Sequence, residues 1–138
     1  MALFDSVKKA LNRPEPARAG DPPAAAAPRP APEDIRPPEV RVLDLLPAYH
    51  NGSAPQLLDC REPAEWQQVR IPGSLHIPMN QIPARLAELD QGEEWVVVCA
   101  HGNRSLAVAG YLIANGFRAS SLAGGVSDWW MRGGPTES

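Results

Sequence analysis

The residues around Cys99 have the types and the spacing of a reactive thiol site. Residues 95–110 read WVVVCAHGNRSLAVAG, so an apolar, β-branched run ends on the cysteine, a short polar loop follows, and a helical pattern comes next. Such a run is typical of a strand buried on both faces of a mostly parallel sheet. Ligand sites of open α/β sheets lie at the carboxyl edge of the strands, where the next helix presents free N–H groups and a partial positive charge. A thiolate at Cys99 would be stabilised there, and anions would be attracted to it.

The loop after Cys99 has the residue types that an anion-binding loop requires. Gly102 can adopt backbone angles that turn successive N–H groups inward, as in an anion-binding nest. Arg104 adds a fixed positive charge, and Ser105 offers a hydroxyl to the site and an oxygen that can cap the following helix. We therefore expect an anion-binding loop made of Ala100, His101, Gly102, Asn103, Arg104 and Ser105.

Cys99 also has a second interpretation, because free cysteines are often buried and inert. The glycine, the arginine and the helix start beside it favour a reactive cysteine, since thiols with a low pKa occur in such surroundings. His101 has two interpretations as well: it either hydrogen-bonds a departing or accepting group or is simply exposed to water.

Three segments of the chain after about Glu39 resemble the signatures of the rhodanese family. Residues 57–78, LLDCREPAEWQQVRIPGSLHIP, resemble a first signature that usually reads D-V-R-x-x-x-E-[FW] followed by I-P-G-[AS]-x-[HN]-[IL]-P. Residues 96–105, VVVCAHGNRS, resemble the active-site loop, and residues 122–129, LAGGVSDW, resemble the closing L-x-G-G-[IVM]-x-x-W. The three motifs stand in the family's order and at its usual spacing. Cys60 departs from the pattern, because the family usually has valine there.

The resemblance implies a sulfurtransferase. Cys99 would accept a sulfane sulfur from a donor such as thiosulfate or a persulfide and carry it as a cysteine persulfide. It would then pass the sulfur to a thiophilic acceptor such as cyanide, a thiol or a protein. Arg104 would orient the negatively charged donor, and inward N–H groups would stabilise the anionic outer sulfur, as an oxyanion hole does. The resemblance implies no cofactor and no metal.

Two alternatives come from other functional classes. Cysteine-dependent phosphatases, including relatives of rhodanese, also place a thiolate and an arginine around a nest of N–H groups, but with the spacing C-x5-R. The spacing from Cys99 to Arg104 is C-x4-R, and the shorter loop should leave too little room for a phosphate ester. The second alternative is a rhodanese-like binding module without catalysis, although such copies commonly lack the cysteine that this chain retains.

Several residues near the first signature have an open role. Asp59 and Arg61 point to the same face of a strand end by the period of two, so they either line the mouth of the anion-binding loop or form a structural ion pair or cap. His76 is expected to be structural. Cys60 faces the opposite way, toward the core. It is either a small buried residue in place of valine or a resolving cysteine that forms a disulfide with Cys99.

Alternating strand and helix patterns predict the elements that position these residues. We expect strands at residues 40–42, 56–59, 74–77, 95–99 and 119–122. We expect helices at residues 44–50, 63–69, 80–89 and 105–115, with Asn80 capping the third, and a last short helix capped by Ser127 that carries Trp129 and Trp130. This alternation predicts an α/β fold with a central, mainly parallel five-stranded sheet flanked by helices. The three-layer fold implied by the resemblance to rhodanese is the same.

Length, charge and cysteine content limit the ligands and the location that we expect for the protein. A chain of 138 residues is long enough for one domain with a core, and a formal net charge of −3 gives no reason to expect nucleic acid as a ligand. Two cysteines 39 positions apart do not make a disulfide framework or a metal-ligand cluster, so a reducing cytoplasm is the expected location. No apolar run approaches the ~20 residues that span a bilayer, and the N-terminus lacks the apolar core of a signal peptide.

The N-terminal part has a different composition from the rest. Residues 1–12 place Leu3, Phe4, Val7 and Leu11 at helical spacing, which predicts either a short amphipathic helix that docks on an unknown partner or a frayed terminus. Residues 13–38 hold nine of the sixteen prolines and a run of four alanines, which predicts a disordered linker. The rhodanese-like domain is expected to cover residues 39–138.

Overall fold

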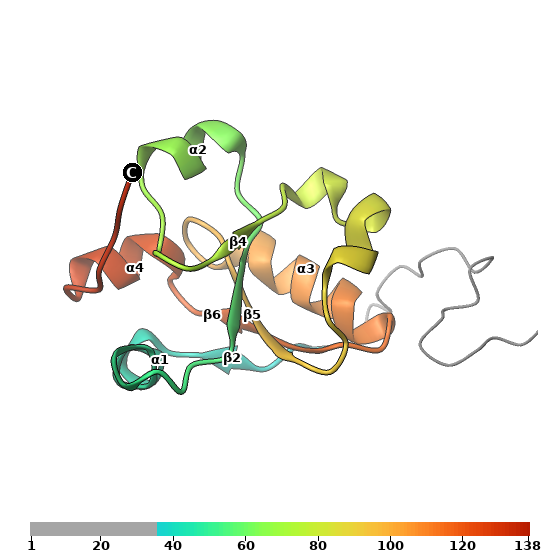
Figure 1. Ribbon diagram of the computed structural model, residues 1–138, viewed down its shortest axis with the longest axis horizontal. Coiled ribbons are helices and arrows are strands. Elements are labelled where there is room, and N and C mark those ends of the chain that lie inside the picture. The colour runs from blue at the N-terminus through green and yellow to red at the C-terminus, as the bar shows by residue number, and fades with distance from the viewer. Residues whose placement is uncertain (1–35) are drawn as a thin grey trace, which may run out of the picture.

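The computed structural model describes residues 36–138, which form a parallel sheet covered by helices on both faces (Figure 1). The five strands are β2 (Glu39–Val40), β3 (Gln56–Asp59), β4 (Leu75–His76), β5 (Glu94–Val98) and β6 (Arg118–Leu122). They lie in the order β2-β6-β5-β3-β4, and all four neighbouring pairs are parallel. The predicted α/β fold with a five-stranded sheet is confirmed.

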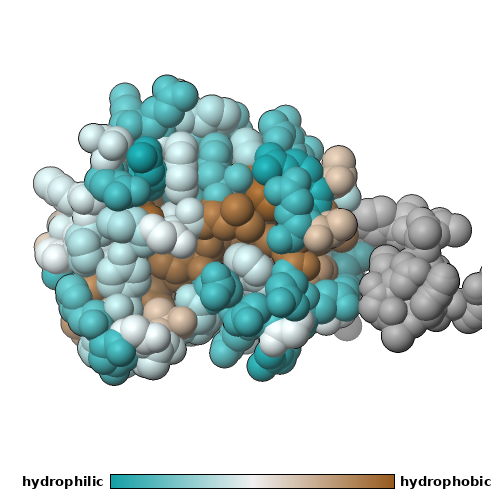
Figure 2. Space-filling model, in the orientation of Figure 1, coloured by the Kyte–Doolittle hydropathy of each residue, from teal (hydrophilic) through white to brown (hydrophobic). Residues whose placement is uncertain are grey.

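The helical segments form the two outer layers. They are α1 (Val42–Asn51), α2 (Pro63–Gln68), the 3₁₀ segments η1 (Met79–Gln81) and η2 (Pro83–Glu88), α3 (Asn103–Ala114) and α4 (Gly125–Met131). Helices α1 and α3 lie on opposite sides of the sheet in Figure 1. In the same orientation, Figure 2 shows hydrophobic residues in a band across the middle of the molecule, between hydrophilic margins.

The central strand β5 contributes to both layers of the core because its side chains alternate. Trp95, Val97 and Cys99 belong to a buried cluster with α3. Val96 and Val98 belong to a second cluster, on the side of α1 and α4. This double burial accounts for the continuous apolar run in the sequence. Cys99 follows the strand directly, at its carboxyl end.

The first predicted strand and the third predicted helix are partly wrong. Helix α1 begins at Val42, two residues before the predicted start, because the Val42 side chain is buried in the core and the Arg41 carbonyl accepts the first helical N–H groups. The segment 80–89 forms two 3₁₀ segments instead of one helix. Pro83 supplies no N–H to the preceding turn, and Arg85 has a non-helical φ of −120°. Asn80 therefore caps no helix.

Glycines, and not serines, precede the helices at the carboxyl edge of the sheet. Gly102 and Gly124 are the N-cap residues of α3 and α4, with φ of 102° and 80°, a left-handed conformation that disfavours serine. A Cβ on Gly102 would lie 3.1 Å from the Gly124 nitrogen, so the two loops approach too closely for a larger residue to fit easily. The capping roles predicted for Ser105 and Ser127 are wrong for this reason, and each serine is the third residue of its helix.

The last residues of the predicted linker contact the sheet. The predicted helix at residues 1–12 and residues 13–35 of the predicted linker lie outside the described residues. Pro37 is buried, and the Pro38 carbonyl accepts a hydrogen bond from the Ser121 nitrogen at 2.9 Å. Proline can accept but cannot donate, which suits the first residues of an edge strand. Within residues 36–138, no helix is long and apolar enough to cross a membrane.

Candidate functional site

The Cys99 sulfur lies at the centre of a turn of backbone between β5 and α3. Its Sγ accepts hydrogen bonds from the backbone nitrogens of Gly102 at 3.0 Å and Ser105 at 3.3 Å. The Ser105 hydroxyl oxygen lies 3.3 Å from the same sulfur. Cys99 is only 1% exposed. The inward N–H groups of the loop therefore converge on the sulfur itself.

These contacts shift the pKa of Cys99. Burial of the sulfur alone would raise the pKa of the thiol, because it removes water from the charged form. Hydrogen bonds from the Ser105 hydroxyl and from the backbone N–H groups of Ser105, Gly102 and His101 act in the opposite direction and lower the Cys99 pKa below its ordinary value. The sulfur is thus both shielded from bulk water and stabilised as a thiolate.

Helix α4 holds the other side of the loop. The carbonyl oxygens of Cys99 and Ala100 accept hydrogen bonds from the nitrogens of Val126 and Ser127 at 2.9 and 3.0 Å. A Cβ on Gly125 would overlap the Cys99 carbonyl oxygen, so only glycine allows this approach. The paired glycines of the closing motif are therefore part of the site. The signal for this contact in the sequence is the pair of glycines in LAGGVSDW.

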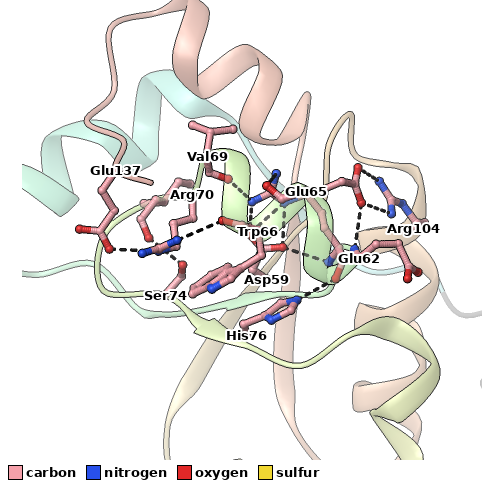
Figure 3. Close-up of polar contacts among 12 residues, drawn as sticks. Asp59, Glu62, Glu65, Trp66, Val69, Arg70, Ser74, His76, Arg104 and Glu137 are labelled. Atoms are coloured by element: carbon pink, nitrogen blue, oxygen red, sulfur yellow. Dashed lines mark hydrogen bonds and ion pairs between the residues drawn. The ribbon is translucent and has the colours of Figure 1, made fainter.

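Arg104 forms an ion pair with a residue from a distant part of the sequence. Its Nη1 and Nη2 donate to Oε1 and Oε2 of Glu65 at 2.9 and 3.0 Å (Figure 3). Glu65 also accepts a hydrogen bond from the Glu62 nitrogen at 2.9 Å, as part of a capping box at the start of α2. The Arg104 hydrogen bond is the main cause that lowers the pKa of Glu65 to about 2. The same pairing raises the pKa of Arg104.

Asp59 and Arg61 form a buried ion pair behind the site. Their exposed fractions are 0% and 3%, and Arg61 Nη2 lies 2.8 Å from Asp59 Oδ2. Arg61 also donates to the carbonyl oxygens of Glu65 at 3.3 Å and Val69 at 2.6 Å, which ties the middle and the C-terminal end of α2 to the end of β3. Of the two predicted roles, the structural ion pair fits this geometry. Neither side chain lines an open mouth.

The remaining loop residues form the outer surface of the site. His101 and Asn103 are exposed, and Ala100 is partly exposed. His76 lies away from this surface: its Nε2–H donates to the Arg61 carbonyl at 2.8 Å, and its ring stacks on Trp66 with centroids 4.7 Å apart. These contacts agree with a structural role for His76. Among residues 36–138, no group of three or more His, Cys, Asp or Glu side chains is arranged to hold a metal ion.

Comparison with known proteins places the chain in a family. The model of the rhodanese-like domain family matches residues 43–132. The chain belongs to the rhodanese-like domain family. This finding confirms the resemblance carried by the three sequence motifs.

Relatives of this rhodanese-like domain have names that describe sulfur transfer. A sulfurtransferase of Allochromatium vinosum is 39% identical over 80 residues, which cover 57% of this chain and 75% of the relative. The thiosulfate sulfurtransferase GlpE of Pseudomonas aeruginosa is 38% identical over 96 residues, covering 69% and 81% of the two chains. The crystal structure of a rhodanese-related protein from Thermoplasma volcanium superposes with a TM-score of 0.66 at 31% identity, covering 72% and 97%.

Cys60 lies beside Cys99 in this rhodanese-like domain. The Cys60 nitrogen donates to the Val98 carbonyl at 2.9 Å, which continues the parallel pairing of β3 and β5. Both cysteines are buried, free, and part of the same core cluster. Burial, followed by the charges of Cys99 and Asp59, raises the pKa of Cys60 to about 12. Cys60 thus stays a neutral thiol at neutral pH, which favours the packing role over attack on a persulfide.

Proposed function

We propose that this rhodanese-like domain is a sulfurtransferase in which Cys99 carries sulfane sulfur as a persulfide. The observation that carries the proposal is the convergence of two backbone N–H groups and one hydroxyl on Cys99 Sγ. These donors favour the thiolate, which is the nucleophile that the first step needs. The names of the relatives support the same class of reaction.

The proposed cycle has two displacements at sulfur. In the first, the Cys99 thiolate attacks the outer sulfur of thiosulfate, a new S–S bond forms, and sulfite leaves with the electron pair of the broken S–S bond. In the second, an acceptor such as cyanide attacks the outer sulfur of the persulfide, and thiocyanate leaves as the Cys99 thiolate is restored. Each step breaks one bond to sulfur and forms another, so no external oxidant or reductant is required. A low thiolate pKa also makes Cys99 a good leaving group in the second step.

The charges of the site suit an anionic donor and an anionic intermediate. In the proposal, the N–H groups of the loop stabilise negative charge on either sulfur of the persulfide, because they are fixed before the reaction starts. Arg104 orients the donor from its position against Glu65. Thiosulfate or a persulfide is the proposed donor, and a small thiol, cyanide or a protein is the proposed acceptor. The free thiols suit a reducing compartment, so we propose a cytoplasmic location.

Steady-state turnover tests the proposal against a cysteine phosphatase and a binding module. Thiocyanate formation from thiosulfate and cyanide should be measured for the full chain and for Cys99→Ser, with aryl phosphate hydrolysis followed in parallel. The proposal expects thiocyanate formation that Cys99→Ser abolishes, and no phosphate release that depends on Cys99. Phosphatase activity dependent on Cys99 would support the alternative enzyme. A folded protein without either activity would support a binding module.

A further inference from the structure

A chain of two buried serine hydroxyls leads away from the Cys99 sulfur. Ser105 Oγ lies 3.3 Å from Cys99 Sγ, and Ser121 Oγ lies 2.7 Å from Ser105 Oγ. Both serines have exposed fractions of 0%. Buried hydroxyls without a hydrogen bond are costly, so their hydrogens must point at the partners present.

The fold brings the second serine to this place from another strand. Ser121 lies on β6 and pairs in register with Val97 of β5, whose side chain packs in the cluster under α3. Side chains alternate along a strand, so Ser121 faces α3 while its neighbour Ser120 faces the opposite layer. Ser120 Oγ is buried and has no hydrogen-bond partner among the residues that the structure describes. The two adjacent serines therefore have different surroundings.

The state of the sulfur fixes the direction of this hydrogen-bond chain. In the thiol form, the Cys99 S–H can donate to Ser105 Oγ, and the Ser105 hydroxyl can then donate to Ser121. A thiolate or the inner sulfur of a persulfide has no hydrogen, so the Ser105 hydroxyl must donate to Cys99 Sγ. The Ser121 hydroxyl then donates to Ser105 Oγ and satisfies the oxygen that has turned its hydrogen toward sulfur.

We propose that Ser121 is a positioning residue that holds the Ser105 hydroxyl in the orientation that donates to the Cys99 sulfur. Chains of hydroxyls polarise one another, so a donor behind Ser105 makes the Ser105 hydrogen bond to sulfur stronger. For its meaning in sulfur transfer the inference rests on the proposed function. The orientation itself requires only that Cys99 loses its proton.

Ser121→Ala removes none of the other charged and titratable groups around the Cys99 loop. They are Cys60 and the Asp59–Arg61 pair at the end of β3, Glu65 on α2, Arg104 on α3, Asp128 on α4, which pairs with Arg132, and the exposed His101 of the loop. The hydrogen bonds and ion pairs given for these residues go to other partners, whereas the hydrogen-bond partner of Ser121 Oγ is Ser105. A change in Cys99 ionisation in a Ser121 variant would thus report the loss of the hydroxyl.

The test is the pH dependence of Cys99 alkylation by iodoacetamide in the full chain, with the modified cysteine identified by peptide mass mapping. Ser121→Ala should lower the thiolate fraction of Cys99 at a pH below its pKa by roughly threefold to tenfold, the value of one modest hydrogen bond. The matched control is Ser120→Ala, which removes a neighbouring buried hydroxyl and should leave the alkylation profile unchanged. Ser121→Thr, which keeps the hydroxyl, should have the same alkylation profile as the unchanged protein.

A double variant separates positioning from general loosening of the loop. If Ser121 acts through Ser105, Ser121→Ala should have almost no further effect on the pH profile in a Ser105→Ala background. A Ser121→Ala profile identical to that of the unchanged protein would overturn the inference, as would an equal shift in the Ser105→Ala background. Alkylation does not require sulfur transfer, so a failed inference and a failed sulfurtransferase proposal give different results.

Discussion

Glu65 of α2 and Arg104 of α3, 39 positions apart in the sequence, form a two-point ion pair beside the Cys99 loop. The cation predicted to bind an anionic donor is therefore already balanced by a carboxylate. Both side chains are about one third exposed, at 34% for Arg104 and 33% for Glu65. The pair thus fixes the direction of the guanidinium and also limits the positive charge that a donor meets.

Glu65→Gln should lower the KM for thiosulfate by about twofold to fivefold, because an uncompensated Arg104 attracts a dianion more strongly. The same variant should make the KM more sensitive to added salt. Glu62→Gln is the control, since it removes an equal charge at the N-cap of α2 and keeps the Glu65–Arg104 pair. Glutamine can still accept the capping hydrogen bond from the Glu65 nitrogen. Equal KM changes in the two variants would show that net charge, and not the Glu65–Arg104 pair, sets donor affinity.

The loss of folding stability at acid pH should also depend on Glu65. Its pKa is about 2 in the folded protein, mainly because of Arg104, whereas an ordinary glutamate has a pKa of about 4.3. A depressed folded pKa contributes stability that is fully present above about pH 4.3 and is lost as the pH falls toward about 2. The difference in melting temperature between the unchanged protein and Glu65→Gln should therefore shrink over this range. A constant difference would contradict the assigned pairing.

Arg61→Ala should destabilise the protein by about 3–5 kcal/mol, because it leaves the Asp59 carboxylate buried without its partner. Urea unfolding measures this loss. Replacing both residues, as Asp59→Asn with Arg61→Leu, should cost less than Arg61→Ala alone, since no unpaired charge remains. A loss below about 1 kcal/mol in Arg61→Ala would show that water reaches Asp59.

Gly125→Ala should both destabilise the fold and disturb Cys99. Its φ of 61° is unfavourable for alanine, and the added methyl would overlap the carbonyl groups of Cys99 and Ala100. Gly133→Ala is a matched control, with a φ of 82° and open space around the new methyl. The free energy of unfolding of the control should fall by about 1–2 kcal/mol, because alanine is strained in the left-handed conformation. The free energy of unfolding of Gly125→Ala should fall by more. Equal losses of unfolding free energy in the two variants would mean that α4 does not support the Cys99 loop.

The sequence predicted what depends on local pattern and missed what depends on close approach of distant segments. The apolar run before Cys99 located the central strand, because residues buried on both faces leave a continuous signal. The helix starts at Gly102 and Gly124 were missed, because serine is usually the better cap. Here a Cβ on Gly102 would lie 3.1 Å from the Gly124 nitrogen, which favours glycine. Ser121 gave no signal at all, because its partner Ser105 is 16 positions away on another element.

The predicted site residues show the same difference between local contacts and contacts of distant segments. Cys99, Gly102 and Ser105 come together as the spacing suggested, because they belong to one short turn. The partner of Arg104 lies in a different motif, because Glu65 is the glutamate of the first rhodanese signature. The alternation along β3 correctly placed Asp59 and Arg61 on one face, but their mutual pairing buried them both.

Intact-mass and peptide-mass measurement after thiosulfate treatment shows directly whether Cys99 carries sulfane sulfur. We expect one added sulfur, about 32 Da, located on Cys99, removed by cyanide as thiocyanate and absent in Cys99→Ser. Cys60→Val should still load one sulfur, and no peptide should contain a Cys60–Cys99 disulfide. A folded protein whose mass stays unchanged under saturating thiosulfate, or that loads sulfur on Cys60 instead, would contradict sulfur transfer at Cys99.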